Sequence, residues 1–229
     1  MDVRTLRRAI AVVLLLAFGI LLGLWVRSRV PAFDRAILDF AVAHRTATWT
    51  TFFRAAALCG GTPAVTVLTL VVAVAAVWRR WWTLAGQAVV AGVGTAVLVV
   101  AGKSAFGRPR PPAATQLGVL QSLSYPSGHA LGSMVAATLL LALVFAATRA
   151  GPWRVLAVLL VAVYVVWVGL SRLYLGVHWG SDVLGGWVIG AAWGLLCLGL
   201  PGRQRKTWPP VLTASQEPAA AQTDSDAST

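Results

Sequence analysis

Three short polar clusters stand out from a sequence that is otherwise strongly apolar. They combine cations, histidines and one aspartate, in the order Lys103, Arg110-Pro111, Pro126-Ser127-Gly128-His129, Ser171-Arg172, His178 and Asp182. Arginine offers a planar pair of donors to two phosphate oxygens, and lysine offers a compact point charge. The first turn of a helix, with glycine in it, presents free backbone N–H groups to an anion. These clusters predict a phosphate-binding pocket made by Lys103, Arg110, Ser127, Gly128 and Arg172.

The third cluster also holds a potential nucleophile and its support. His178 and Asp182 are four residues apart, so they share a face if that stretch is helical. Asp182 could accept the Nδ1–H of His178, which would leave Nε2 unprotonated and able to attack phosphorus. His129, at the start of another helix, could protonate the leaving oxygen as a general acid. The three cations would stabilise the charge on the transferring phosphoryl group.

Carboxylates are scarce along the part of the chain that carries these clusters. Asp182 is the only Asp or Glu between Asp39 and Glu217. Magnesium ions and two-metal centres are held mainly by carboxylate oxygens. We therefore expect metal-independent chemistry, with no metal site and no cofactor.

The composition predicts that membrane helices position these residues. The chain of 229 residues is 58% hydrophobic and 11% charged, whereas a soluble domain has about 25% charged residues. Apolar runs close to the length of a bilayer-crossing helix recur along it. They predict an all-α bundle of six transmembrane helices, at about Ala9–Val26, Ala64–Trp78, Thr83–Gly102, Ala130–Thr148, Trp153–Gly169 and Asp182–Leu200.

Two segments fall outside these runs. Residues 31–58 are mixed. Phe33, Ile37, Phe40 and Ala41 recur at helical spacing, with Asp34 on another face, which predicts a helical segment that lies at the membrane interface or packs over the helix ends. Residues 207–229 have few large apolar side chains and predict a disordered tail. We expect one membrane phosphatase domain over 1–206, with its catalytic motifs between 103 and 182.

The net charge of +12 does not indicate nucleic-acid binding, because the basic residues stand at the ends of apolar runs. Anionic lipid headgroups explain them better, so membrane lipids are the expected surroundings. With the N-terminus inside, the inner segments would hold Arg4, Arg7, Arg8, Arg79, Arg80, Arg149, Arg154, Arg203, Arg205 and Lys206. Because basic residues favour the cytoplasmic side, this placement predicts a multi-pass protein of the cell membrane, with cytoplasmic termini and the clusters on the outer face. The oligomeric state stays open.

Each cluster also has a simpler interpretation. Lys103 and Arg110 could be ordinary interfacial cations, and Ser127 could be an N-cap at a helix start. His178 and Asp182 could be a structural hydrogen-bonded pair. The conjunction of three clusters at one expected membrane face favours the chemical interpretation.

The three clusters resemble the signature motifs of the type 2 phosphatidic acid phosphatase superfamily, and they match at every signature position. The resemblance implies that His178 forms a phosphohistidine, that Asp182 orients it and that His129 protonates the leaving group. It also implies a set of phosphate ligands, which are Lys103, Arg110, Ser127, Gly128 and Arg172. The superfamily includes vanadium haloperoxidases and bacterial acid phosphatases as well as membrane enzymes.

The favoured function is therefore hydrolysis of a lipid phosphate or pyrophosphate. The resemblance implies the candidate lipids, and among them undecaprenyl pyrophosphate is preferred, because an outer-facing site suits recycling of an envelope carrier. Phosphatidic acid and phosphatidylglycerophosphate are the alternatives. A transporter or anion-binding protein is the alternative of another class, and vanadate-dependent oxidation is a third hypothesis, which the membrane spans disfavour because those relatives are soluble.

Overall fold

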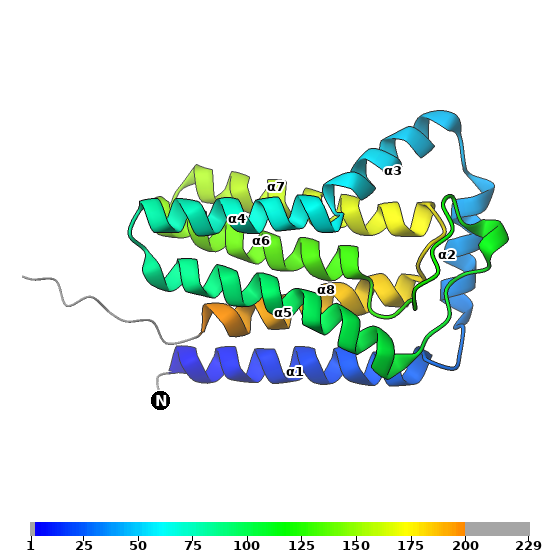
Figure 1. The fold of residues 1–229 in the computed structure, drawn as a ribbon, viewed down its shortest axis with the longest axis horizontal. Helices are drawn as coiled ribbons and strands as arrows, with labels where there is room; N and C mark the ends of the chain where they lie inside the picture. The colour runs from blue at the N-terminus through cyan, green and yellow to red at the C-terminus, as the bar shows by residue number, and fades with distance from the viewer. Residues whose placement is uncertain (1–2, 200–229) are drawn as a thin grey trace, which may run out of the picture.

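The computed structural model describes residues 3–199, which form eight α-helices and one short 3₁₀ helix (Figure 1). The elements are α1 (Val3–Val26), α2 (Ala32–Ala43), α3 (Ala47–Cys59), α4 (Thr62–Trp78), α5 (Trp82–Phe106), η1 (Ala113–Thr115), α6 (Gly128–Ala147), α7 (Pro152–Tyr174) and α8 (Gly180–Leu198). The predicted tail at 207–229 and the predicted domain end at 206 lie outside the described residues.

Five of these helices are long and apolar enough to cross a bilayer: α1, α5, α6, α7 and α8. The helix expected as the second span, α4, has 17 residues and meets that standard only together with α3, from which it is bent by 46°. By length and composition the described chain therefore has five spans, or six if the bent pair is one span. The prediction of an all-α membrane bundle is confirmed.

The segment between the first two spans is divided into two helices. The chain turns between them at residues 44–46, where the Thr46 hydroxyl accepts a hydrogen bond of 3.2 Å from the Trp49 N–H and so caps α3. Helix α2 runs across one end of the bundle, and α3 leads from it to the start of α4 (Figure 1).

Helix α2 lies across the bundle end with Asp34 on its buried face (Figure 1). Its apolar residues Phe33, Ile37 and Phe40 are exposed, whereas Asp34 is fully buried together with Leu38. Asp34 is held there by a buried arginine and by the start of α8.

Close contact between α6 and α8 brings two of the polar clusters together. A Cβ atom added at Gly186 would lie 2.7 Å from the backbone oxygen of Ser127, and one added at Gly190 would lie 2.7 Å from that of Leu131. Small residues let two membrane helices approach backbone to backbone. The glycines of α8 thus bring the start of α6, with its His129, close to the helix that carries Asp182.

All three clusters lie at the same end of the bundle. Helices α5 and α7 end there and α6 and α8 begin there, beside α2 (Figure 1). The start of α1 and the end of α8 meet at the opposite end, where Arg8 donates a hydrogen bond of 3.3 Å to the Leu198 carbonyl. The connections between helices therefore gather polar residues that are up to 79 positions apart along the chain.

Candidate active site

A cavity of about 620 Å³ opens between α4, α5 and α6 and reaches the polar end of the bundle. Six of the eight residues predicted to act on phosphate line its polar end: Lys103, Arg110, Gly128, His129, Arg172 and His178. The structure thus places three cations and two imidazoles around one space.

The other two predicted residues, Ser127 and Asp182, lie behind the cavity wall. Ser127 is fully buried and its hydroxyl accepts a hydrogen bond of 3.5 Å from the Ala130 N–H, as the N-cap of α6. Its own N–H donates to the Asp182 carbonyl over 3.1 Å. In this arrangement Ser127 connects the starts of α6 and α8.

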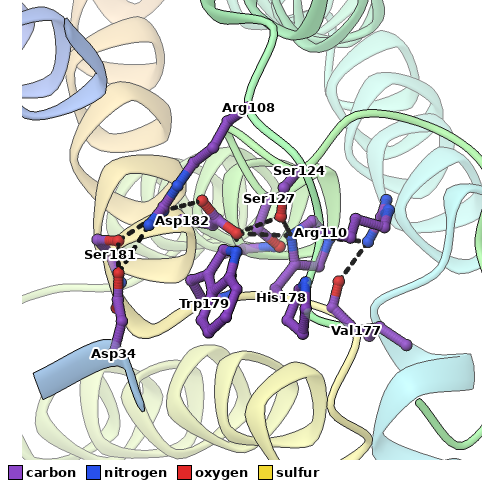
Figure 2. Close-up of polar contacts among 12 residues, drawn as sticks. Asp34, Arg108, Arg110, Ser124, Ser127, Val177, His178, Trp179, Ser181 and Asp182 are labelled. Atoms are coloured by element: carbon purple, nitrogen blue, oxygen red, sulfur yellow. Dashed lines mark hydrogen bonds and ion pairs between the residues drawn. The ribbon is translucent and has the colours of Figure 1, made fainter. Parts of the chain in front are cut away.

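The hydrogen bonds around His178 select one tautomer of its ring (Figure 2). Nη1 of Arg110 lies 3.2 Å from Nε2, and a guanidinium can only donate, so Nε2 accepts. The proton is then on Nδ1, which lies 3.4 Å from Oδ2 of Asp182 and 3.4 Å from Oγ of Ser124. These two distances are longer than the usual 2.7–3.2 Å, so Nδ1–H is shared loosely between both acceptors.

Burial keeps the His178 ring neutral. It lowers the pKa of His178 to about 4, against the opposing effect of the hydrogen bond and the charge of Asp182. Burial of the charged form is the larger effect because the side chain is 3% exposed. At neutral pH Nε2 therefore carries a lone pair, which in this structure accepts the hydrogen bond from Arg110.

Asp182 has hydrogen-bond partners on both oxygens. Oδ2 accepts from the Trp179 N–H over 2.8 Å and from the Ser124 hydroxyl, and Oδ1 accepts from Nη1 of Arg108 over 2.5 Å. The carboxylate stands in the first turn of α8, where the helix dipole favours negative charge. These contacts fix the position of Asp182 beside His178.

Four residues of this end were missed by the sequence analysis: Asp34, Arg108, Ser124 and Ser181. They are all buried and hydrogen-bonded to one another or to Asp182 (Figure 2). The one available signal was the doubled Arg-Pro at 108–111, in which only the second arginine was assigned. Nothing in the local sequence of Asp34 indicated a partner near the active site.

A serine oxygen occupies the space between two of the predicted phosphate ligands. Oγ of Ser122 accepts from Nζ of Lys103 over 2.9 Å and from Nη2 of Arg110 over 2.9 Å. Nε of Arg110 also donates to the Ser122 carbonyl over 2.5 Å. Two cations that converge on one neutral oxygen are arranged as they would be around an anion.

A family comparison matches residues 80–206, more than half of the chain, to the PAP2 superfamily. This range contains all three polar clusters.

The chain belongs to the PAP2 superfamily. The resemblance seen in its motifs is thereby confirmed at the level of the family.

Solved structures with the same fold support this assignment. A transmembrane PAP2-type phosphatidylglycerolphosphate phosphatase from Bacillus subtilis superimposes with a TM-score of 0.71 at 28% identity, over 82% of this chain and 94% of that one. LpxE from Aquifex aeolicus superimposes with a TM-score of 0.57 at 21% identity, over 74% of this chain and 97% of that one. The second likeness concerns the fold alone. The first establishes this PAP2 protein as a multi-pass membrane protein.

A curated relative shares a shorter stretch. The undecaprenyl-diphosphatase of Sulfolobus acidocaldarius is 44% identical over 69 residues, which are 30% of this chain and 29% of the relative. The match spans less than a third of that protein's length.

Away from the polar end, the cavity of this PAP2 protein is an apolar groove. Its walls come from α4 and α5 and include Leu70, Ala73, Val89 and Val93. From Lys103 to Ala88 the groove follows α5 for fifteen residues, which corresponds to about 22 Å of helix. Leu70, Val89 and Val93, which line this groove, are exposed.

Among residues 3–199 there is no group of three or more His, Cys, Asp and Glu side chains placed to hold a metal ion. The polar end of the cavity offers cationic and imidazole groups, which suit a bound oxyanion.

Proposed function

We propose that this protein is a lipid phosphatase that removes a terminal phosphate through a covalent phosphohistidine on His178. The observation that carries the proposal is the contact of 3.2 Å between Nη1 of Arg110 and Nε2 of His178, at the wall of a cavity lined by Lys103, Arg110 and Arg172. A neutral imidazole beside three cations suits attack on a phosphoryl group better than simple anion binding.

The reaction would proceed in two displacements. In the first, Nε2 of His178 forms a bond to phosphorus while the bond from phosphorus to the leaving oxygen breaks, and His129 gives its proton to that oxygen. In the second, water attacks phosphorus and passes a proton to His129, the P–N bond breaks, and inorganic phosphate leaves. Asp182 stabilises the cationic His178 that exists during the transfer. We propose Lys103, Arg110, Arg172 and the backbone at Gly128 as the phosphate ligands, and Ser127, whose side chain is buried, would contribute through the helix start that it caps.

The apolar groove supports a lipid as the substrate. The phosphate would lie at the polar end, and the hydrocarbon chain would follow α5 into the bilayer. The groove gives the tail about 22 Å along the helix. A soluble phosphate ester would leave this apolar surface uncovered.

We favour a polyprenyl pyrophosphate such as undecaprenyl pyrophosphate as the substrate. The partial match to an undecaprenyl-diphosphatase supports it, and so does the apolar groove beside the site, which could take one long hydrocarbon chain. Phosphatidylglycerophosphate is the second candidate, supported by the likeness to the Bacillus subtilis enzyme over most of both chains. Phosphatidic acid would present the same terminal group.

The site would face the outside of the cell membrane. The start of α1 and the end of α8 lie at the end of the bundle opposite to the site. Arg79 and Arg80, between α4 and α5, and Arg149, between α6 and α7, lie at that opposite end as well. Short basic loops are retained in the cytoplasm, which supports cytoplasmic termini. Labelling of single cysteines at Ala113 and at Arg149 by an impermeant maleimide in intact cells tests this, with reaction at 113 alone expected.

The placement of charge disfavours a transporter. Transport sites lie near the middle of the bilayer at broken helices, whereas here the cations and histidines gather where helices begin and end. Vanadate should act as an inhibitor that resembles the transferring phosphoryl group.

The deciding experiment is phosphate release by the purified protein from a panel of lipid phosphates. Undecaprenyl pyrophosphate, farnesyl pyrophosphate, phosphatidylglycerophosphate and phosphatidic acid would be compared with and without EDTA. We expect the highest kcat/KM for a polyprenyl pyrophosphate and unchanged activity in EDTA. Preference for phosphatidylglycerophosphate would replace the favoured substrate, and loss of activity that Mg²⁺ restores would overturn the metal-independent mechanism.

A further inference from the structure

We infer that Arg108 and Asp34 are positioning residues that hold Asp182 as a carboxylate against His178, so that α2 completes the active site. The inference rests on the proposed function, because it assigns to Asp182 the support of a nucleophilic His178. Neither residue belongs to the three polar clusters.

Arg108 connects two buried carboxylates. Its Nη1 donates to Oδ1 of Asp182 over 2.5 Å and its Nη2 donates to Oδ2 of Asp34 over 2.8 Å (Figure 2). Both carboxylates are fully buried and Arg108 is 1% exposed. Asp182 turns its other oxygen, Oδ2, toward His178. Arg108 therefore determines which oxygen of Asp182 faces the imidazole.

Asp34 holds Arg108 and the start of α8 at once. Its Oδ1 accepts from the Ser181 N–H over 2.8 Å, and its Oδ2 accepts from the Ser181 hydroxyl over 2.6 Å. The same serine hydroxyl accepts from Arg108 over 2.6 Å. Asp34 thus supplies a negative charge and two acceptors to the N-terminus of the helix that carries Asp182.

The fit between α2 and α8 is tight at this point. A Cβ atom added at Gly180 would lie 2.8 Å from Cδ1 of Ile37 and 3.2 Å from Oδ1 of Asp34. The carboxylate of Asp34 consequently has little freedom to move away from Ser181, and a small shift of α2 would be transmitted to Asp182.

Arg108 compensates the charge of the two carboxylates that it contacts. With His178 neutral, one guanidinium stands between two carboxylates, and the group carries one net negative charge. Removal of the guanidinium would leave two buried carboxylates without a cation, and an uncompensated buried charge is strongly unfavourable. One of them would take up a proton. A protonated Asp182 would no longer stabilise a cationic His178.

Arg108 is not placed to bind the substrate. It does not line the cavity, unlike Arg110 and Arg172. Its guanidinium lies 5.7 Å from the ring of Trp179, whose indole N–H is bound by the Pro109 carbonyl over 3.0 Å. Changes at Arg108 should therefore act on the chemical step and not on phosphate binding.

The test compares Arg108→Met, Asp34→Asn and the double variant, with farnesyl pyrophosphate as the probe. We expect Arg108→Met to lower kcat at least about 100-fold and Asp34→Asn about tenfold, each with KM within about threefold of the wild type. The double variant should have a higher kcat than Arg108→Met alone, because it contains one buried carboxylate in place of two. A double variant equal to or worse than Arg108→Met would overturn the inference, as would a loss confined to KM.

Matched controls separate this result from a general loss of structure. Asp39→Asn changes an exposed aspartate on the same helix and should leave kcat unchanged. Size-exclusion elution and Tm in detergent identify folded variants. If Arg108→Met does not fold, the test rests on Asp34→Asn. If the kcat of Asp34→Asn then equals that of Asp39→Asn, the inference is overturned. An inactive wild type would count against the proposed function itself, whereas an active wild type with unaffected variants would count against the positioning role alone.

Discussion

Nη1 of Arg110 donates a hydrogen bond of 3.2 Å to Nε2 of His178, the nitrogen that the proposed mechanism uses as its nucleophile. The same Nη1 also donates to the Val177 carbonyl, next to His178 in the chain. One arginine thus fixes the ring and marks the place where a phosphoryl group would enter between cation and imidazole.

Replacement of His178 by alanine should abolish phosphate release. Without Nε2 no covalent phosphoenzyme can form, and we expect kcat to fall by at least about 10³-fold. Acid-labile ³²P incorporation from labelled substrate measures the intermediate directly. His44→Ala, an exposed histidine at the end of α2, is the control and should retain both activity and labelling. Normal turnover by His178→Ala would end the assignment of the nucleophile.

The His178 ring should stay neutral well below neutral pH. Burial lowers its pKa to about 4, from about 6.5 in an unfolded chain. Protonation therefore favours the unfolded chain, and the contribution of this group to stability is present above about pH 6.5 and is lost as the pH falls toward 4. With three histidines in the sequence, ¹⁵N-histidine NMR of the wild type and of His44→Asn and His129→Asn assigns each ring. A His178 signal that titrates near 6.5 would contradict the burial argument.

The effect of replacing His129 on activity should depend on the leaving group of the substrate. A general acid contributes about 10²–10⁴-fold when the leaving oxygen needs a proton. We expect His129→Ala to lose activity to that extent with an alkyl phosphate, and far less with p-nitrophenyl phosphate. Quenched-flow measurement of the first turnover isolates the departure of the leaving group. Equal losses with both substrates would remove the acid role from His129.

An obstruction in the apolar groove should lower the activity on a substrate with a long tail more than the activity on one with a short tail. Ala96 lines the groove seven residues before Lys103, about 10 Å along α5. We expect Ala96→Phe to lower kcat/KM for farnesyl pyrophosphate about tenfold or more relative to dimethylallyl pyrophosphate, whose tail ends before this point. Val90→Phe, on the same helix but outside the groove, is the control. Parallel changes for both substrates would place the tail elsewhere.

Removal of the Ser122 hydroxyl should strengthen oxyanion binding. This oxygen accepts from both Lys103 and Arg110, so an entering phosphate or vanadate must displace it. One hydrogen bond contributes about 1 kcal/mol, and we expect Ser122→Ala to lower the vanadate inhibition constant about fivefold. Ser104→Ala, on α5 with its hydroxyl bonded to Val100, serves as the control. Weaker vanadate inhibition would show that Ser122 binds the oxyanion directly.

The sequence by itself determined the class of fold and the chemical groups of the site. Apolar runs near bilayer length are local signals, so five helices long enough to span could be predicted with their approximate bounds. The types and spacing of Lys103, Arg110, His129, Arg172 and His178 were also sufficient to expect one phosphate pocket, because helices that alternate in direction return those residues to the same end.

Only the tertiary structure decided how that pocket is supported. Asp34 and Arg108 are 74 residues apart, and Asp34 and Ser181 are 147 apart, so no local pattern connects them. Apolar periodicity placed Phe33, Ile37 and Phe40 on one face of α2, but it could not show that Asp34, on another face, is buried against a distant arginine. The partner of a buried charge is fixed by packing, and here the glycines of α8 and the placement of α2 across the bundle end bring Asp34, Arg108 and Asp182 together.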